Sequence, residues 1–450
     1  MVATPKILTR YSLFFFFFTV QYFFIKFFNL DSLSSVLDTH WQFLDLNYLQ
    51  SDSVGAIFFN HAQPPLLNLI VWFLQKVPYD LYQSFILLNC LCMSSVTFII
   101  YRILVERTST KFARSFSIFY AVLPSVILNI TYPFYTCIVA LGYTLIAFGF
   151  HLVRTRTIHS IFFFSLGIII VVFTRQSFTF FHVFLSCAWL YFLGRKEFGD
   201  NKIKIRASLV ALFIITLLLP IKNLYYYGFF GSSSWLPQTL SSGWKITTPL
   251  GPFPSPREIM NEYPNIKCRQ VHSNPDLRLE KSNGEPNFHS CLVLEYSKIV
   301  LENGLSGYSP TKHLKSIVDY TGEYFSLPDE YMFLTNREKI RIYAEFMKIP
   351  QLAITYKLFP QGSTHELRIV LILPAILFLT VLRKRSNYLT ISLILMVLIH
   401  FLTYTFSEGA ESSRFVFEVE PLFSLLLGFF LFEIISLIER NKLSISGKFF

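Results

Sequence analysis

Two carboxylates and three cations are the side chains of this sequence best placed to do chemistry. Asp38 and Asp45 lie in the first polar stretch after an N-terminal apolar run, and Arg175, Lys222 and Arg414 each lie at the edge of a later apolar run. Ionisable groups at such positions are costly, so a functional site is the first hypothesis for them. A carboxylate can act as a general acid or base, and cations can bind an anionic ligand.

Three of these residues also have a plainer interpretation. Asp38 is suited to be the N-cap of a short surface helix. Lys222 can extend its ammonium group to the lipid headgroups without any further role. Arg414 lies three residues from Glu411 and four from Glu418, a spacing typical of ion pairs at a helix end.

The stretch Phe59–Asn68, "FNHAQPPLLN", combines a histidine, an amide and two prolines just before an apolar run. No HxxxH or HxH spacing accompanies His61, so the sequence predicts no metal site there. Proline is tolerated in the first turn of a helix, where its missing N–H would have no partner anyway. Pro64 and Pro65 are therefore expected to start a short helix.

The composition identifies a membrane protein. Of the 450 residues, 53% are hydrophobic and 18% aromatic, more than a soluble domain carries. The net charge of +11 comes from short basic clusters between apolar runs, which is a topology signal and not a nucleic-acid surface. The sequence contains no P-loop, dinucleotide glycine motif or paired CxxC.

We expect an all-α multi-pass membrane protein of about 10 transmembrane helices with a cytoplasmic N-terminus. This orientation places every basic cluster on one side, provided that residues 64–77 do not cross the membrane. That segment has about 14 apolar residues, which favours a re-entrant, interfacial or buried helix. The expected spans lie near 7–28, 81–104, 115–131, 133–153, 158–178, 179–194, 207–224, 367–382, 388–406 and 416–438.

Two long segments are expected on the outer, extracytoplasmic side. We call residues 29–80 the first loop, which should carry short interfacial helices, and residues 228–366 the polar domain, a small extracytoplasmic domain. Residues 1–227 then form an N-terminal membrane module and residues 367–450 the C-terminal membrane helices. Cys268 and Cys291 are the two cysteines of the polar domain, and they could form a disulfide in an oxidising compartment.

Several elements, taken in order, resemble the glycosyltransferase C-fold superfamily, and most closely its protein O-mannosyltransferase and aminoarabinose-transferase (glycosyltransferase family 39-like) branch. These are the early acidic residue of the first loop, "HAQPPL" at 61–66, "NITYPFY" at 129–135, Arg175 and "GAESSRFVFEVEP" at 409–421. The resemblance covers residues 1–225 and 367–440. The polar domain matches no family that we can name.

The resemblance implies transfer of a sugar, with inversion, from a polyprenyl- or dolichyl-phosphate donor to an acceptor hydroxyl. It assigns the base to an acidic residue of the first loop, Asp38 first and Asp45 second, although Asp-Thr stands here where the family often has Asp-Glu. A phosphate is a good leaving group that needs only cations. Donor and acceptor contacts also fall to His61, Gln63 and Glu411, and the phosphate would be bound by Arg175, Lys222 and Arg414.

No cofactor is expected; a divalent cation is possible, but nothing in the sequence supports one. The expected partners are the lipid-phosphate donor, a protein or glycolipid acceptor and the bilayer, but not nucleic acid. The chain would reside in the endoplasmic reticulum or the bacterial inner membrane. The competing hypothesis is a transporter or flippase without chemistry, for which polar groups at mid-membrane and inverted halves would be typical.

Overall fold

The part of the chain that the computed structural model describes is helical, and its only pairing of extended backbone is an isolated bridge between Glu280 and Pro286. The described residues are 5–30, 37, 40, 42–175, 180–196, 198–243, 248, 250–251, 254–268, 278–307, 309–312, 388–407 and 412–446.

The helices lie along the chain in the following order. They are α1 (Pro5–Phe27), α3 (Leu46–Ser51), α4 (Ser53–Phe58), α5 (Pro65–Gln75), α6 (Leu81–Val105), α7 (Thr110–Ala121), α8 (Pro124–Thr131), α9 (Thr136–Leu152), α10 (Thr157–Thr174), α11 (Phe180–Gly194), the 3₁₀ turn η1 (Gly199–Asn201), α12 (Lys202–Tyr227), α13 (Leu236–Gly243), α14 (Pro256–Glu262), α15 (Cys291–Gly307), α20 (Tyr388–Ser407) and α21 (Ser412–Ser446).

Four of the described helices are long and apolar enough to cross a membrane: α6, α10, α12 and Phe417–Glu439 of α21. Helices α7 and α8 make a fifth if they count as one span with a bend of 45°. At 1.5 Å per residue the 25 residues of α6 extend about 37 Å, more than the hydrocarbon core of about 30 Å. The chain is an integral membrane protein built from α-helices.

The expected count of about ten spans is not reached in the described residues. The apolar stretches of α1, α9, α11 and α20 lie where spans were predicted, but they contain only 10–17 residues. Seventeen residues extend only about 25 Å. The predicted run at 115–131 breaks because Pro124 starts a new helix, α8. The run at 367–382 lies outside the described residues.

Helix α9 lies in the centre of the bundle, and nearly all of its residues are buried. Its packing against α10 depends on glycine. A Cβ atom on Gly142 would lie 2.7 Å from a methyl carbon of Val171, and one on Gly167 would lie 2.5 Å from the carbonyl oxygen of Gly142. Small residues at these positions therefore let the two helix backbones approach closely, as in other membrane helix pairs.

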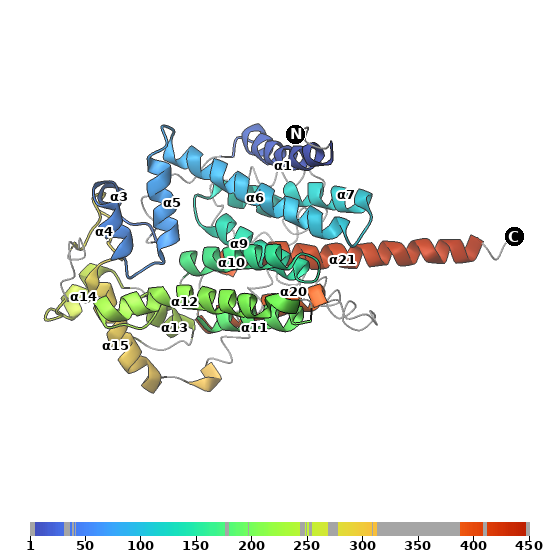
Figure 1. The fold of residues 1–450 in the computed structure, drawn as a ribbon. Coiled ribbons are helices and arrows are strands. Elements are labelled where there is room, and N and C mark those ends of the chain that lie inside the picture. Colours follow the sequence, from blue (N-terminus) through green and yellow to red (C-terminus); the bar gives the residue numbers. More distant parts are fainter. Residues whose placement is uncertain are drawn as a thin grey trace.

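The short polar helices gather at one end of the bundle. Figure 1 shows α3, α4, α14 and α15 at this end, while α21 runs past the opposite end to the C-terminus. Helix α12 reaches the same polar end and stops there because Gly228 adopts a left-handed conformation (φ 66°) that suits glycine at a helix terminus. The described parts of the first loop and of the polar domain consequently lie together.

Helix α5 runs across the end of the bundle, not along it (Figure 1). It begins at Pro65, with Pro64 as its N-cap, as predicted. Its eleven residues extend about 16 Å, too short to cross a bilayer. Leu67, Val71 and Leu74 form its buried face, and the Asn68 side chain accepts a hydrogen bond (3.0 Å) from the backbone N–H of Leu44 in the first loop.

Basic side chains collect at the opposite end, where α6, α9 and α20 meet. Arg102 and His151 both contact Glu106, at 3.5 and 3.0 Å. The guanidinium groups of Arg107 and Arg154 lie 5.5 and 4.1 Å from the ring centre of Tyr388. Basic clusters that the sequence assigns to one side of the membrane therefore do meet at one end of the bundle.

Candidate functional site

The turn before α5 joins the first loop to α12. The Asn60 side chain accepts hydrogen bonds from the backbone N–H groups of Ala62 (2.9 Å) and Gln63 (3.3 Å), which fixes the turn. The Lys222 ammonium of α12 donates to the carbonyl oxygens of Phe58 (3.0 Å) and Asn60 (2.6 Å). Lys222 therefore caps this turn and does not simply extend to the headgroups.

His61 joins the same turn to the polar domain. Its Nδ1 shares a hydrogen bond with the Ser234 hydroxyl (2.8 Å), and its carbonyl oxygen accepts one from the Ser234 backbone N–H (2.9 Å). The Ser233 hydroxyl donates to the Ala62 carbonyl oxygen. On the far side of the turn, His289 donates to the Asn60 side chain (3.1 Å). His61 was predicted to contact a ligand. Instead, it is buried between the turn before α5 and the Ser233–Ser234 segment of the polar domain.

Burial, followed by the nearby Lys222 ammonium, lowers the pKa of His61 to about 3. An unfolded chain takes up a proton at its histidines near pH 6.5, whereas folded His61 does not. The free energy of unfolding should therefore fall as the pH drops from about 6.5 to about 3, by up to about 1.4 kcal/mol per pH unit. His61→Gln removes this titrating group, so the free energy of unfolding should depend less steeply on pH between about 3 and 6.5. Thermal unfolding at several pH values in that range measures the difference. The same change at exposed His159 is the control, and an equal flattening there would contradict the prediction.

Asp45 links the first loop to a second part of the polar domain, the segment that contains Arg278 and Ser282. Its carboxylate is the N-cap of α3 and accepts hydrogen bonds from the backbone N–H groups of Asn47 (3.0 Å) and Tyr48 (3.4 Å). The backbone N–H and the hydroxyl of Ser282 both donate to it at 2.8 Å, and Arg278 lies 3.9 Å away. The Asn47 amide in turn donates to the Ser282 hydroxyl (2.9 Å).

These contacts make Asp45 a weak candidate for a base. Burial alone would raise the pKa of Asp45, but the hydrogen bonds from Ser282, Asn47 and Tyr48 outweigh it and hold the pKa below its ordinary value. A general base works best when its pKa lies near the operating pH. Asp45 therefore fits a structural role better than a catalytic one.

Two described residues flank Asp38 in the sequence, Leu37 and His40, and both are in contact with the rest of the protein. Asp38 itself lies outside the described residues, but Leu37 is buried in the main core and His40 is described. The His40 ring shares a hydrogen bond with the Tyr132 hydroxyl and packs on Phe134, both in the "TYPFY" stretch. From the polar domain, the Lys281 ammonium donates to the carbonyl oxygen of His40 (3.0 Å).

A small open cleft lies where the first loop meets the polar domain. The space between its walls is about 420 Å³ with the open solvent at its mouth counted, so this is not the volume of an enclosed cavity. Its walls combine aromatic and aliphatic groups with a carboxylate, a guanidinium and amides. The lining residues are Leu44, Asp45, Tyr48, Gly55, Ala56, Phe59, Asn60, Arg278, Glu280, Asn287 and His289.

Arg175 lies in a separate, buried charged cluster near the ends of α10, α20 and α21. Its Nε lies 3.2 Å from a carboxylate oxygen of Glu418, and its Nη1 donates to the Tyr135 hydroxyl (2.7 Å). The His400 ring lies 3.6 Å from the same Glu418 oxygen. Arg175 is 4% exposed and Glu418 is fully buried. Arg175 was predicted to bind a phosphate, but its positive charge is paired with the Glu418 carboxylate inside the protein.

The remaining predicted site residues are placed only in part. Glu411 lies outside the described residues, as Asp38 does, and Arg414 is described only as backbone of α21. Gln63 is 4% exposed in the turn before α5. Among the side chains that the structure describes, no group of three His, Cys, Asp or Glu residues is arranged to hold a metal ion.

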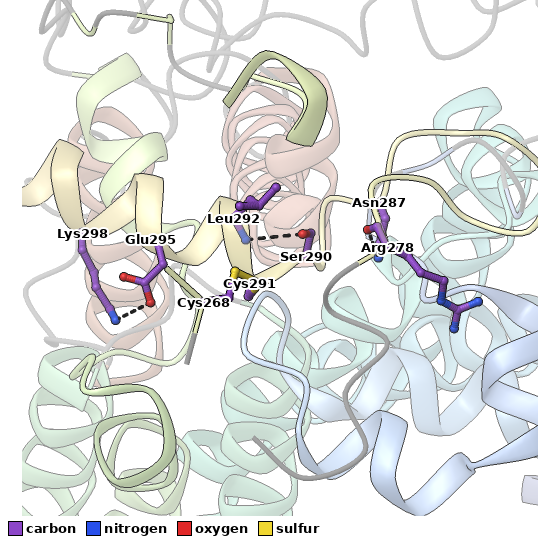
Figure 2. The surroundings of a disulfide bond; sticks show 8 residues. All are labelled: Cys268, Arg278, Asn287, Ser290, Cys291, Leu292, Glu295 and Lys298. Carbon is purple, nitrogen blue, oxygen red and sulfur yellow. Dashed lines mark hydrogen bonds and ion pairs between the residues drawn. A yellow bond between two sulfur atoms is a disulfide. The ribbon is translucent and has the colours of Figure 1, made fainter. Parts of the chain in front are cut away.

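A disulfide joins Cys268 to Cys291, the pair that the sequence allowed. Cys291 is the first residue of α15 and lies 23 positions after Cys268. The stretch that the bond closes contains Arg278 and the Ser282 turn that binds Asp45. Figure 2 shows the bond beside the start of α15, with Arg278 and Asn287 further along the same stretch.

Cys291→Ser should lower the free energy of unfolding of the polar domain by about 3 kcal/mol, since a bond that closes a loop of this length restricts the unfolded chain by that amount. Thermal unfolding measured without and with reductant tests this. Reductant should lower the free energy of unfolding of wild type to that of the variant, and it should leave the free energy of unfolding of the variant unchanged. Cys187→Ser, which removes a buried free thiol, is the control. Equal stability of wild type and Cys291→Ser without reductant would contradict the prediction.

Comparison with known family models, curated proteins and solved structures finds no match. The site must therefore be interpreted from its own residues. Sequence reasoning missed Lys281, Ser282 and Ser234 because the polar domain carries no recognisable motif. The signal that could have pointed to this region is the pair of cysteines, which encloses the Ser282 turn.

Proposed function

We propose that this chain is a membrane glycosyltransferase. It would transfer a sugar from a polyprenyl- or dolichyl-phosphate donor to an acceptor hydroxyl, on the extracytoplasmic side and with inversion. In this proposal Asp38 is the base, and the phosphate leaves as its charge is bound by cations. The acceptor is a protein or a glycolipid, and the membrane is that of the endoplasmic reticulum or the bacterial inner membrane.

One observation carries the proposal. His40, two residues after Asp38 in the sequence, is held between the ends of membrane helices and the polar domain through its contacts with Tyr132 and Lys281. An enzyme that joins a lipid-phosphate donor to a water-soluble or headgroup hydroxyl needs such a site, because the donor's phosphate lies at the surface of the bilayer. Reacting groups must also be held in fixed geometry.

The two ends of the bundle support the proposed sidedness. The first loop and the polar domain meet at one end, whereas the basic cluster of Arg102, Arg107 and Arg154 lies at the other. Basic residues are enriched on the cytoplasmic side of membrane proteins. This arrangement supports the proposed cytoplasmic N-terminus and extracytoplasmic site.

The buried cluster of Arg175, Glu418 and His400 is the observation that favours the transporter hypothesis. Ionisable groups among membrane helices often mark ion or proton pathways. Here, however, Arg175 and Glu418 pair with each other near the helix ends, and each is buried. A fixed internal pair suits a brace between helices better than a moving charge, so we favour the enzyme.

The deciding experiment incubates the purified wild-type chain in nanodiscs with radiolabelled polyprenyl-phosphate hexoses and with hydroxyl-bearing peptides or glycolipids. We expect labelled acceptor and released polyprenyl phosphate in equal amounts. A parallel liposome experiment measures movement of the same lipids across the bilayer. Lipid movement without any transfer of sugar would refute the proposal and support the transporter.

A further inference from the structure

Arg278 lines the cleft between the first loop and the polar domain, with 50% of its side chain exposed. Its backbone carbonyl oxygen accepts a hydrogen bond from the Asn287 amide (3.0 Å), and its guanidinium lies 5.6 Å from the ring centre of Tyr48. Figure 2 shows the side chain extending away from the disulfide. The Asp45 carboxylate is 3.9 Å away, farther than a hydrogen bond reaches. The guanidinium is therefore held in place while its N–H groups make no hydrogen bond within the described residues.

Asn60 brings a second donor to the wall of the same cleft. Its Oδ1 accepts hydrogen bonds from the backbone N–H groups of Ala62 and Gln63 and from the His289 ring. These three donors fix which end of the amide is the oxygen, so the other end must be the NH₂ group. That nitrogen is buried and has no hydrogen-bond partner in the part of the chain that the structure describes. Such buried groups are rare and call for an explanation, of which a ligand is one.

The charges around the cleft are balanced. The Asp45 carboxylate lies beside the Arg278 guanidinium, and the Glu280 carboxylate pairs with the guanidinium of Arg257. An anionic ligand would meet two carboxylates, and a cationic ligand would meet Arg278. The Glu280 side chain is 39% exposed, so it can still accept hydrogen bonds from a ligand. The cleft therefore suits a neutral ligand that both donates and accepts hydrogen bonds.

We propose that this cleft binds a neutral sugar ring of the acceptor, so that the acceptor is a glycolipid and not a protein. This inference rests on the proposed function. A sugar ring carries adjacent hydroxyl groups, each a donor and an acceptor, which Arg278, Glu280 and Asn60 can recognise together. The rings of Tyr48 and Phe59 supply apolar wall for its carbon atoms. A serine or threonine side chain offers a single hydroxyl and would leave most of these polar groups unmatched.

The test measures binding of methyl glucoside, methyl galactoside and methyl mannoside to the purified full-length chain in nanodiscs by saturation-transfer NMR. A neutral, blocked threonine tripeptide is the comparison, and we expect a hexoside to bind but not the tripeptide. Arg278→Met keeps the aliphatic stem but removes the N–H donors, so it should weaken hexoside binding about tenfold. Lys267→Met is the matched control, because it removes an exposed cation of the same domain that does not line the cleft.

Three binding results would overturn the inference: no binding of any hexoside, binding of the tripeptide instead, or equal hexoside binding by wild type and by Arg278→Met that thermal unfolding shows to be folded. Should Arg278→Met fail to fold, Arg278→Lys replaces it. That variant keeps the charge but loses the planar group of donors, and it should weaken binding several-fold; unchanged binding would again overturn the inference.

The sugar-transfer assay separates this inference from the proposed function, because the function is tested by transfer of label from the donor. With a glycolipid acceptor, Arg278→Met should raise KM for the glycolipid about tenfold and leave KM for the donor unchanged. A rise in KM for the donor alone would place the donor's sugar in the cleft, which would overturn the inference while the proposed function stands. Hexoside binding that depends on Arg278, in a chain that transfers no sugar, would refute the proposed function and leave the cleft as a sugar site.

Discussion

Glu418→Gln should lower the free energy of unfolding of the membrane bundle by about 3–5 kcal/mol, the range found when one partner of a buried ion pair is removed. Glutamine keeps the size of the side chain but removes its charge, which leaves the Arg175 guanidinium buried beside a neutral amide. Both side chains are almost completely buried, so water cannot compensate the lost charge. Because α10, α20 and α21 meet at this cluster, the loss should affect the whole bundle.

Unfolding of the purified protein by heat or by a denaturing detergent provides the measurement. Glu439→Gln removes a charge from an exposed position of the same helix and should change stability by less than about 0.5 kcal/mol. The double variant Arg175→Met, Glu418→Gln should recover most of the loss, since no buried charge then remains uncompensated. A double variant that is as unstable as the single one would show that packing, and not charge, determines the effect.

The positions of the apolar helices could be predicted from the sequence because hydropathy is a local property. The ends of α6, α11 and α20 fall within about two residues of the expected runs, a difference within the usual uncertainty of helix ends. Which helices are long enough to cross a membrane was harder to predict than where they lie. Burial of α9 on all sides and the break at Pro124 depend on packing and on one residue, and a hydropathy window averages over both.

The site could be predicted only in part, for a related reason. The residues of "HAQPPL" were correctly expected to start a helix, since proline acts through its own backbone. The contacts of His61 with Ser234 and of His40 with Lys281 join residues 173 and 241 positions apart, and no local pattern encodes such pairs. Arg175 was taken for a ligand-binding cation because its partner, Glu418, lies on a helix near the other end of the chain.

Asp38→Asn should reduce sugar transfer by about 10²- to 10⁴-fold, the usual contribution of a general base. The change removes the carboxylate that would accept the proton of the attacking hydroxyl, but it leaves the cations that would bind the donor phosphate. We therefore expect kcat to fall while KM for the donor remains close to that of wild type. The measurement is release of polyprenyl phosphate from a labelled donor, with and without acceptor, at several donor concentrations.

Asp45→Asn is the control for this change, because Asp45 is the other acidic residue of the first loop considered as the base. Asparagine keeps one acceptor oxygen, which can still cap α3 and accept from the Ser282 hydroxyl, although its NH₂ group replaces the oxygen that accepts from the Ser282 backbone N–H. The variant should therefore fold and lose less than about tenfold of its activity. The four hydrogen bonds to Asp45 and its lowered pKa argue that it does not remove a proton. If Asp45→Asn reduces sugar transfer more than Asp38→Asn does, the base is Asp45. The hydrogen bonds from Ser282 to Asp45 must then break during the reaction.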